Sequence, residues 1–141
     1  MIKVLFVCVH NAGRSQMAEA FTNLHGGGVV RALSAGTLPG NTLNPVVVQA
    51  MTERGIDIAT NQPKVLDQSM IDEADRIYTM GCAVDESCPI SFTPSEDWGL
   101  PAPAGEPIEI VRLIRDDIER RVKTLLHGLQ AGTISVEPRK Y

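Results

Sequence analysis

The N-terminal region holds a cysteine and an arginine at a spacing that suits chemistry on a tetrahedral oxyanion. Cys8 and Arg14 are separated by five residues, and Ser15 follows directly. Backbone N–H groups of a short loop at a helix N-terminus point inward, and with the helix dipole they form a cradle for an anion. The planar guanidinium of Arg14 matches two oxygens of such an anion. The expected oxyanion-binding loop consists of Val9, His10, Asn11, Ala12, Gly13 and Arg14.

The same loop favours Cys8 as a nucleophile. Its positive field lowers the pKa of a thiol at its base, so a thiolate is available near neutral pH, and the Ser15 hydroxyl can hydrogen-bond to the sulfur. A thiolate needs no general base, so we expect His10 to tune or pack the loop. The chain has no G-x-x-x-x-G-K-[ST] sequence, which argues against nucleotide binding. The alternative is a buried structural cysteine beside an incidental arginine.

The chain has three cysteines, an odd number that does not fit a disulfide framework of the secreted type. Redox or nucleophilic use is therefore favoured for Cys82 and Cys88 as well. Zinc sites prefer paired cysteines at short spacing with further ligands, and His25 and His127 are not arranged in that way. No metal is expected, and metal ligation or simple burial remain the alternatives for these two cysteines.

Short apolar runs alternate with helical patterns along the chain. Strands are expected at residues 2–7, 29–33, 76–80 and 89–92, and helices at 15–24, 44–54, 67–74 and 107–129. This alternation predicts an α/β fold, a three-layer sandwich in which a four-stranded parallel sheet is flanked by helices. Ligands of such sheets bind beyond the carboxyl ends of the strands, where Cys8 and Cys82 both fall.

Length and composition predict one globular domain over residues 1–141, with 130–141 as a loosely ordered tail. Hydrophobic residues make up 43% and charged residues 21% of the chain, and the net charge is −4. Such a chain has no global positive field for nucleic acid or anionic lipid. It also has neither the run of about 18 apolar residues of a membrane helix nor a signal peptide. We therefore expect a cytoplasmic monomer with no nucleic-acid or membrane partner.

The motifs resemble those of the thioredoxin-coupled arsenate reductases, which are built on the low-molecular-weight protein tyrosine phosphatase fold. The resemblance runs from Val4 to about Val122, most of the chain. It is carried by CVHNAGRSQMAEA (8–20), LSAGT (33–37), the helix start at Asn44-Pro45, GCAVDESCP (81–89) and DWGLPAPAG (97–105). In phosphatase members the loop serine is commonly followed by proline. Here Gln16 follows, as in the reductases.

The resemblance implies that the protein reduces arsenate to arsenite in arsenic detoxification, with phosphate and sulfate as competing oxyanions. After Cys8 has attacked arsenate, Cys82 attacks the Cys8 sulfur, expels arsenite and leaves a disulfide. Cys88 then attacks Cys82, which frees Cys8, and thioredoxin reduces the Cys82–Cys88 bridge. The resemblance implies no tightly bound cofactor, and thioredoxin is implied by the two downstream cysteines.

Ala102 stands where the family usually carries an aspartate that protonates the departing oxygen. Alanine cannot supply this general acid, a role typically worth roughly 10²–10⁴-fold in rate. Asp97, Glu96 or a proton carried by arsenate could replace it. Loss of the acid should harm phosphate-ester hydrolysis more, because that reaction expels the poorer leaving group. The alternative functions are a low-molecular-weight tyrosine phosphatase, or an oxyanion-binding or redox protein without turnover.

Lys64 stands where some relatives place an acidic residue that helps to bind potassium near the loop. Its ammonium could replace the ion by pairing with Glu19 or with the region of Asn11 and Ser34, and these four residues form the expected support of the loop. We therefore predict that activity is independent of potassium, unless Lys64 is an ordinary solvated lysine. Trp98 is expected in the core or in a lid.

Overall fold

The computed structural model describes residues 1–81 and 95–134, and its described strands form one parallel sheet. The strands β1 (Ile2–Cys8), β2 (Val30–Gly36), β3 (Arg76–Thr79) and β4 (Glu96–Asp97) lie in the order β2-β1-β3-β4. The described helices are α1 (Arg14–His25), α2 (Pro45–Thr52), α3 (Gln68–Glu73) and α4 (Ile108–Ala131). The α/β class and the four-stranded parallel sheet predicted from the sequence are confirmed.

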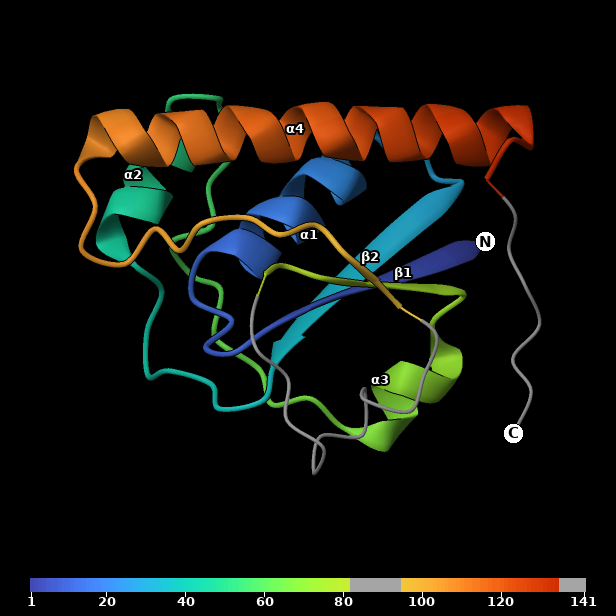
Figure 1. Cartoon of the computed structure of the whole chain (residues 1–141), viewed down its shortest axis with the longest axis horizontal. Coiled ribbons are helices and arrows are strands. Elements are labelled where there is room, and N and C mark those ends of the chain that lie inside the picture. Colours follow the sequence, from blue (N-terminus) through green and yellow to red (C-terminus); the bar gives the residue numbers. More distant parts are fainter. Residues whose placement is uncertain (82–94, 135–141) are drawn as a thin grey trace.

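The two faces of β1 belong to different layers, because successive side chains of a strand point to opposite sides. Val4, Phe6 and Cys8 join the larger apolar cluster, which α1, α2 and α4 share. Leu5 and Val7 join a smaller cluster with α3. Figure 1 shows the same arrangement, with the long α4 across one side of the sheet and α3 on the other. The fold is therefore the expected three-layer sandwich.

The structure shows the helix caps and the buried helix face that the sequence predicts. The side chain of Asn44 accepts a hydrogen bond from the Val46 N–H (2.9 Å), and Pro45 occupies the first helical position of α2. Asp67 caps α3 in the same way at Met70 (2.8 Å). On α4 the predicted apolar stripe is buried, and it consists of Val111, Ile114, Ile118, Val122, Leu125 and Leu129.

The structure adds a short strand and extends the last helix relative to the sequence prediction. The fourth described strand is Glu96–Asp97, which pairs with β3, whereas the strand expected at 89–92 lies outside the described residues. A two-residue strand shows no alternation, so pairing alone defines it. Helix α4 continues to Ala131, and the Ile134 N–H donates to the Gly128 carbonyl (3.0 Å). The first residues of the expected tail at 130–141 are therefore ordered by α4.

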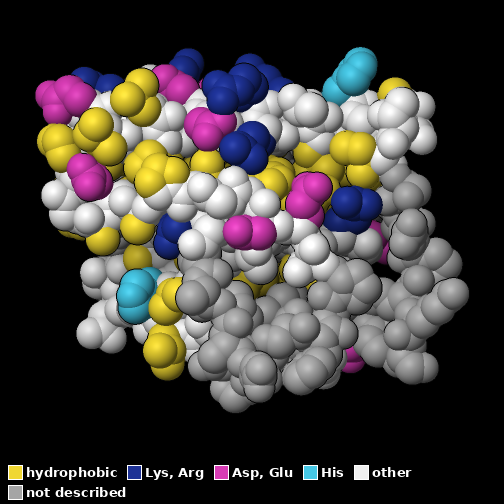
Figure 2. Space-filling model, viewed as in Figure 1, with side chains coloured by type: hydrophobic (Ala, Val, Ile, Leu, Met, Phe, Trp, Pro, Cys, Tyr) yellow, Lys and Arg dark blue, Asp and Glu magenta, His cyan; other side chains and the backbone are white. Residues whose placement is uncertain are grey.

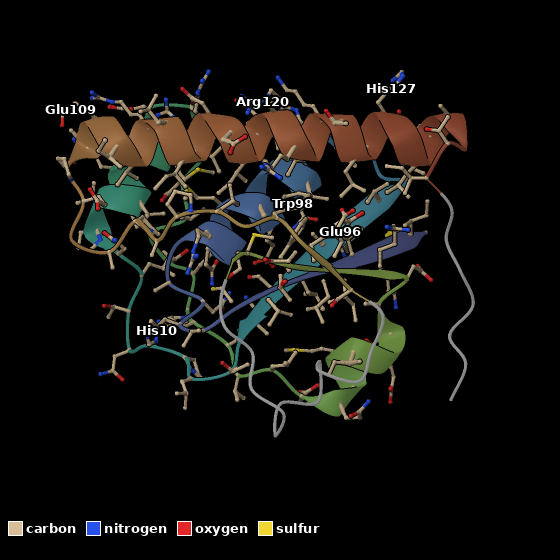
Figure 3. All side chains as sticks on the ribbon, viewed as in Figure 1. His10, Glu96, Trp98, Glu109, Arg120 and His127 are labelled. Carbon is tan, nitrogen blue, oxygen red and sulfur yellow. The ribbon has the colours of Figure 1, made fainter. Side chains whose placement is uncertain are left out.

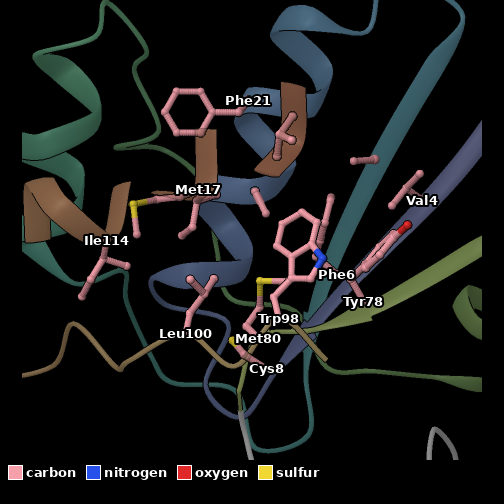
Figure 4. Close-up of a cluster of buried hydrophobic side chains, with 14 of the residues drawn as sticks. Val4, Phe6, Cys8, Met17, Phe21, Tyr78, Met80, Trp98, Leu100 and Ile114 are labelled. Atoms are coloured by element: carbon pink, nitrogen blue, oxygen red, sulfur yellow. The ribbon is translucent and has the colours of Figure 1, made fainter. Parts of the chain in front are cut away.

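The core extends from the middle of the sheet to its carboxyl end. The indole of Trp98 packs against the rings of Phe6 and Tyr78, with centroids 5.4 and 5.0 Å apart. Figure 4 shows this aromatic group next to Met80, with Cys8 at the end of the cluster. The sequence analysis expected Trp98 in the core or in a lid, and the structure places it in the core. The nucleophile candidate therefore sits on a rigid, packed base.

No helix in residues 1–81 and 95–134 combines the length and the apolar character needed to cross a membrane.

Candidate active site

The loop after β1 turns its carbonyl groups outward. The carbonyls of Cys8, Val9, His10 and Ala12 accept hydrogen bonds from the backbone N–H groups of Thr37, Leu38, Gly40 and Asn44 (2.8–3.1 Å). Asn11 holds the turn with φ of 51°, a left-handed conformation that asparagine tolerates better than most residues. An anion cradle requires carbonyl groups that face away from the anion, and the outward carbonyls of this loop meet that requirement.

Cys8 lies at the floor of this loop with two hydrogen-bond partners on its sulfur. The side chain is only 4% exposed, and its Sγ lies 3.1 Å from the donating Asn11 N–H and 2.9 Å from Ser15 Oγ. The Asn11 side chain in turn donates from Nδ2 to Ser15 Oγ (2.8 Å). Hydrogen bonds to sulfur favour the charged form of a thiol. The structure thus brings Ser15 to the Cys8 sulfur, where the sequence analysis expected it, and adds a contact from the Asn11 N–H that the sequence analysis did not predict.

Arg14 begins α1 and closes the loop beside the carboxyl ends of β3 and β4. Its Nη1 donates to the carbonyls of Met80 and Leu100, both at 2.8 Å. The guanidinium thereby links the oxyanion-binding loop to the residues that follow β3 and β4. Its expected contact with the anion stays a prediction.

A cavity of about 100 Å³ opens above Cys8. It is lined by Cys8, His10, Ala12, Gly13, Arg14, Asn44, Ala102, Pro103 and Ala104. Ala102 therefore lies in the wall of the nucleophile's cavity, where the sequence analysis placed the missing acid. None of the lining residues in the described part of the chain is an aspartate or a glutamate. Asn44, which the sequence analysis assigned only to capping, also contributes to the wall.

The two carboxylates proposed to replace the acid lie elsewhere. Glu96 and Asp97 line a separate groove with Trp98, and Figure 3 shows Glu96 and His10 on different parts of the molecule. Burial raises the pKa of Asp97, but hydrogen bonds from Thr79 and the backbone, together with the Arg14 charge, bring this pKa below its ordinary value. Asp97 is ionised at neutral pH, so the structure argues against both residues as proton donors.

The expected support of the loop is assembled around Glu19. Ser34 Oγ donates to Glu19 Oε1 (2.6 Å), and Lys64 Nζ lies 3.5 Å from the same oxygen. The Lys64 N–H donates to Asn11 Oδ1 (2.8 Å). Lys64 therefore contacts the loop through its backbone and the supporting glutamate through its ammonium. A fully solvated lysine, the alternative considered above, does not describe this position.

His10 is exposed, and its Nδ1 lies 3.0 Å from the Leu38 carbonyl. This contact ties the ring to the neighbouring loop, which agrees with a packing role. Within residues 1–81 and 95–134, no group of three or more His, Cys, Asp or Glu side chains could hold a metal ion.

Cys82 and Cys88 lie outside the described residues, but the position from which the chain reaches Cys82 is described. The Met80 N–H donates to the Val7 carbonyl (3.0 Å), so the chain leaves β3 beside the end of β1, which carries Cys8. Gly81 follows with φ of 87°, and the Asp97 carboxylate accepts its N–H at 2.7 Å. The sequence analysis named Gly81 only as the first residue of the motif GCAVDESCP (81–89) and missed these contacts.

The chain matches a family model described as low molecular weight phosphotyrosine protein phosphatase over residues 3–134. A putative arsenate reductase of Halobacterium salinarum is 38% identical over 125 residues, covering 85% of this chain and 87% of that protein. A glutaredoxin arsenate reductase of Synechocystis sp. is 34% identical over 130 residues, covering 89% of this chain and 97% of that protein.

Solved structures lead to the same group of proteins. One described as an arsenate reductase in the phosphate binding state has a TM-score of 0.81 at 33% identity, covering 91% of this chain and 98% of that one. A thioredoxin-dependent arsenate reductase of Corynebacterium glutamicum has a TM-score of 0.74 at 33% identity, covering 94% of this chain and 63% of that one. The chain therefore belongs to the low molecular weight phosphotyrosine protein phosphatase family, together with relatives that are named arsenate reductases.

Proposed function

We propose that the protein reduces arsenate to arsenite, with Cys8 as the attacking thiolate. The observation that carries this proposal is the buried Cys8 sulfur with its donors Asn11 and Ser15, at the floor of a small cavity beside Arg14. The relatives named arsenate reductase, which match most of the chain, support the same substrate. Arg14 and the inward N–H groups would hold the arsenate oxygens.

Two thiols supply the two electrons that As(V) accepts. The Cys8 thiolate attacks arsenic, so that an S–As bond forms and the As–O bond to one hydroxyl breaks, and a proton that arsenate itself carries turns this hydroxyl into water. The Cys82 thiolate then attacks the Cys8 sulfur, so that an S–S bond forms, the S–As bond breaks and its electron pair reduces arsenic to As(III). Cys88 next attacks Cys82 and releases Cys8. The exit of the chain from β3 beside the end of β1 supports Cys82 as the second thiol.

Thioredoxin is the proposed electron donor for the Cys82–Cys88 disulfide. The support is the presence of two cysteines beyond Cys8 and the likeness to a thioredoxin-dependent arsenate reductase. A relative named glutaredoxin arsenate reductase makes glutaredoxin the competing donor. A relay of free thiols needs a reducing compartment, so we place the protein in the cytoplasm.

Phosphatase activity is the competing function within this family. Ala102 argues against phosphatase activity, because the departing oxygen of a phosphate ester needs a proton and no described residue of the cavity wall is an acid. Arsenate loses a hydroxyl that can leave as water, so its reduction depends less on this missing acid.

A coupled turnover assay tests the proposed function. Reduced protein is mixed with arsenate, thioredoxin, thioredoxin reductase and NADPH, and both NADPH oxidation and arsenite are measured. We expect equal molar amounts of NADP⁺ and arsenite, and neither product with Cys8→Ser or Cys82→Ser. Replacing thioredoxin by glutaredoxin and glutathione identifies the donor. Turnover of p-nitrophenyl phosphate that persists in Cys82→Ser, without arsenite from the unmodified protein, would instead establish a phosphatase.

A further inference from the structure

Gln16 is a fully buried polar side chain whose hydrogen bonds all leave its own helix. Its Nε2 donates to Asn11 Oδ1 (3.0 Å) and to the Gln62 carbonyl (3.2 Å), and its Oε1 accepts from Asn61 Nδ2 (3.4 Å). A buried amide is costly unless it is hydrogen-bonded. These contacts tie the oxyanion-binding loop to the segment that ends at Lys64.

The backbone groups at the far end of these contacts fix the orientation of both side-chain amides. The Gln62 carbonyl can only accept, so the nitrogen of the Gln16 amide must face it. The Lys64 N–H can only donate, so the oxygen of the Asn11 amide must face Lys64. Each amide therefore has a single orientation that satisfies its partners, and Asn11 Nδ2 is left facing Ser15 Oγ.

This orientation determines where the Ser15 proton goes. Because Ser15 Oγ accepts from Asn11 Nδ2 at 2.8 Å, its own hydrogen is free for the Cys8 sulfur at 2.9 Å. A flipped Asn11 amide would present its oxygen to Ser15 and take that hydrogen away from the sulfur. We propose that Gln16 is a positioning residue for Cys8, because its Nε2, as the second donor to Asn11 Oδ1 beside the Lys64 N–H, holds Asn11 in the orientation that makes Ser15 donate to the sulfur.

The proposal deepens the proposed function, since it concerns the thiolate that attacks arsenate, but its test requires no arsenate. The experiment uses the full chain with Cys82→Ser and Cys88→Ser, so that Cys8 is the only thiol. The rate of alkylation by iodoacetamide is measured from acid to alkaline pH, which reports the thiolate fraction. Gln16→Met replaces the amide by an apolar side chain of similar length.

We expect Gln16→Met to slow alkylation about tenfold near pH 6, because Asn11 is then held less firmly and the thiolate loses the hydrogen bond from Ser15. The midpoint of the profile moves to higher pH, and the rate at alkaline pH changes little. Ser15→Ala should have a similar effect. Adding Gln16→Met to Ser15→Ala should cause no further loss, because both changes remove the same hydrogen bond.

Thr22→Val is the matched control. Thr22 is also fully buried on α1, and its Oγ1 bonds only to the Ala18 carbonyl of the same helix (2.8 Å). The control profile should coincide with that of the parent. An unchanged profile in Gln16→Met, or effects of Gln16→Met and Ser15→Ala that simply add, would overturn the proposal and leave Gln16 a packing residue.

A second measurement needs no substitution at Gln16 and covers the case in which that variant fails to fold. In the NMR spectrum of the single-thiol chain, the side-chain amide signals of Asn11 and Gln16 should shift with the same midpoint as the Cys8 titration. Signals that do not respond would contradict the proposal. If these tests succeed while the chain yields no arsenite, the proposed function fails and the assignment of Gln16 stands.

Discussion

Ala102 and Cys8 line the same cavity of about 100 Å³, so the general acid is missing at a defined place. The hydrogen-bond partners of the nucleophile do not come from that side, because Asn11 belongs to the loop and Ser15 to the first turn of α1. The two halves of the site are therefore separable. The loop supplies a thiolate and an anion cradle, and the facing wall decides whether a poor leaving group can depart.

Ala102→Asp should raise phosphatase activity, because it places a carboxylic acid across the cavity from Cys8. We expect an increase of roughly 10²-fold with phenyl phosphate, a smaller increase with p-nitrophenyl phosphate, whose leaving group needs less protonation, and little change in arsenate reduction. Steady-state rates with the three substrates measure this. Ala104→Asp is the control, because it adds the same charge to the same cavity. Equal gains in both variants would show that position 102 has no special access to the leaving oxygen.

The position of Lys64 predicts how arsenate turnover responds to sodium and potassium. Its ammonium lies 3.5 Å from Glu19, the carboxylate that also accepts from Ser34. Arsenate turnover should be equal in sodium and potassium salts at the same ionic strength. Lys64→Met leaves the Glu19 charge without this neighbour, so its activity should rise when potassium replaces sodium. Lys123→Met, at a lysine that lies near Glu119 on α4, is the control. A large potassium stimulation of the unmodified protein would refute the prediction.

The end of β3 is held at one point before the chain reaches Cys82. Gly81 has φ of 87°, and a Cβ there would lie 2.6 Å from the Leu100 carbonyl oxygen and 2.7 Å from its nitrogen. The Leu100 carbonyl also accepts a hydrogen bond from Arg14. A movement of Leu100 away from Gly81 would therefore disturb the oxyanion-binding loop. Backbone packing at the ends of two strands thus links the oxyanion-binding loop to the start of the cysteine-bearing segment.

Gly81→Ala should lower both the free energy of unfolding and arsenate turnover. We expect a loss of about 1–3 kcal/mol in urea unfolding from the left-handed backbone, with the clash adding to it. Gly99→Ala is a close control, because Gly99 has φ of 61° but a Cβ there would meet nothing within 4 Å. Both variants carry the conformational cost, and Gly81→Ala alone carries the clash. Equal stability and equal turnover in the two variants would contradict the assigned contact.

Patterns of neighbouring residues predicted the helices and strands, whereas contacts between residues far apart in the sequence were not predicted. The cap at Asn44 and the apolar stripe of α4 depend on residues a few positions apart, so their spacing alone was informative. The bonds from Arg14 to Met80 and Leu100 span 66 and 86 residues, and nothing in the local sequence indicates them. The contacts of Gln16 with Asn61 and Gln62 were not predictable for the same reason, because these partners lie 45 and 46 residues away in a segment without a periodic pattern.

Charge pairs join α2 to α4 across the molecule and thereby support the wall of the cavity that Asn44 provides. Arg115 is 6% exposed, and its Nη1 donates to the Ala50 carbonyl (2.9 Å) and to Glu53 (2.7 Å). Arg112 binds the same carboxylate at 2.7 Å. Figure 2 shows acidic and basic side chains interspersed along this edge of the molecule. Since Arg115 is buried, its charge is compensated by Glu53 together with Asp116, which lies 2.8 Å from Arg115 Nε.

The ion pairs of Glu53 with Arg112 and Arg115 predict how the free energy of unfolding depends on pH. Hydrogen bonds from Arg112 and Arg115 lower the pKa of Glu53 from 4.5 to about 2. The unfolded chain therefore takes up the proton first, and the contribution of Glu53, complete above about pH 4.5, is lost as the pH falls towards 2. Glu53→Gln should be less stable than the parent in urea at neutral pH, and the difference should shrink through this range. Glu106→Gln, at a carboxylate without an ion pair in the described part of the chain, should show no such convergence. A difference for Glu53→Gln that stays constant from neutral pH to pH 3 would mean that its charge does not stabilise the contact between α2 and α4.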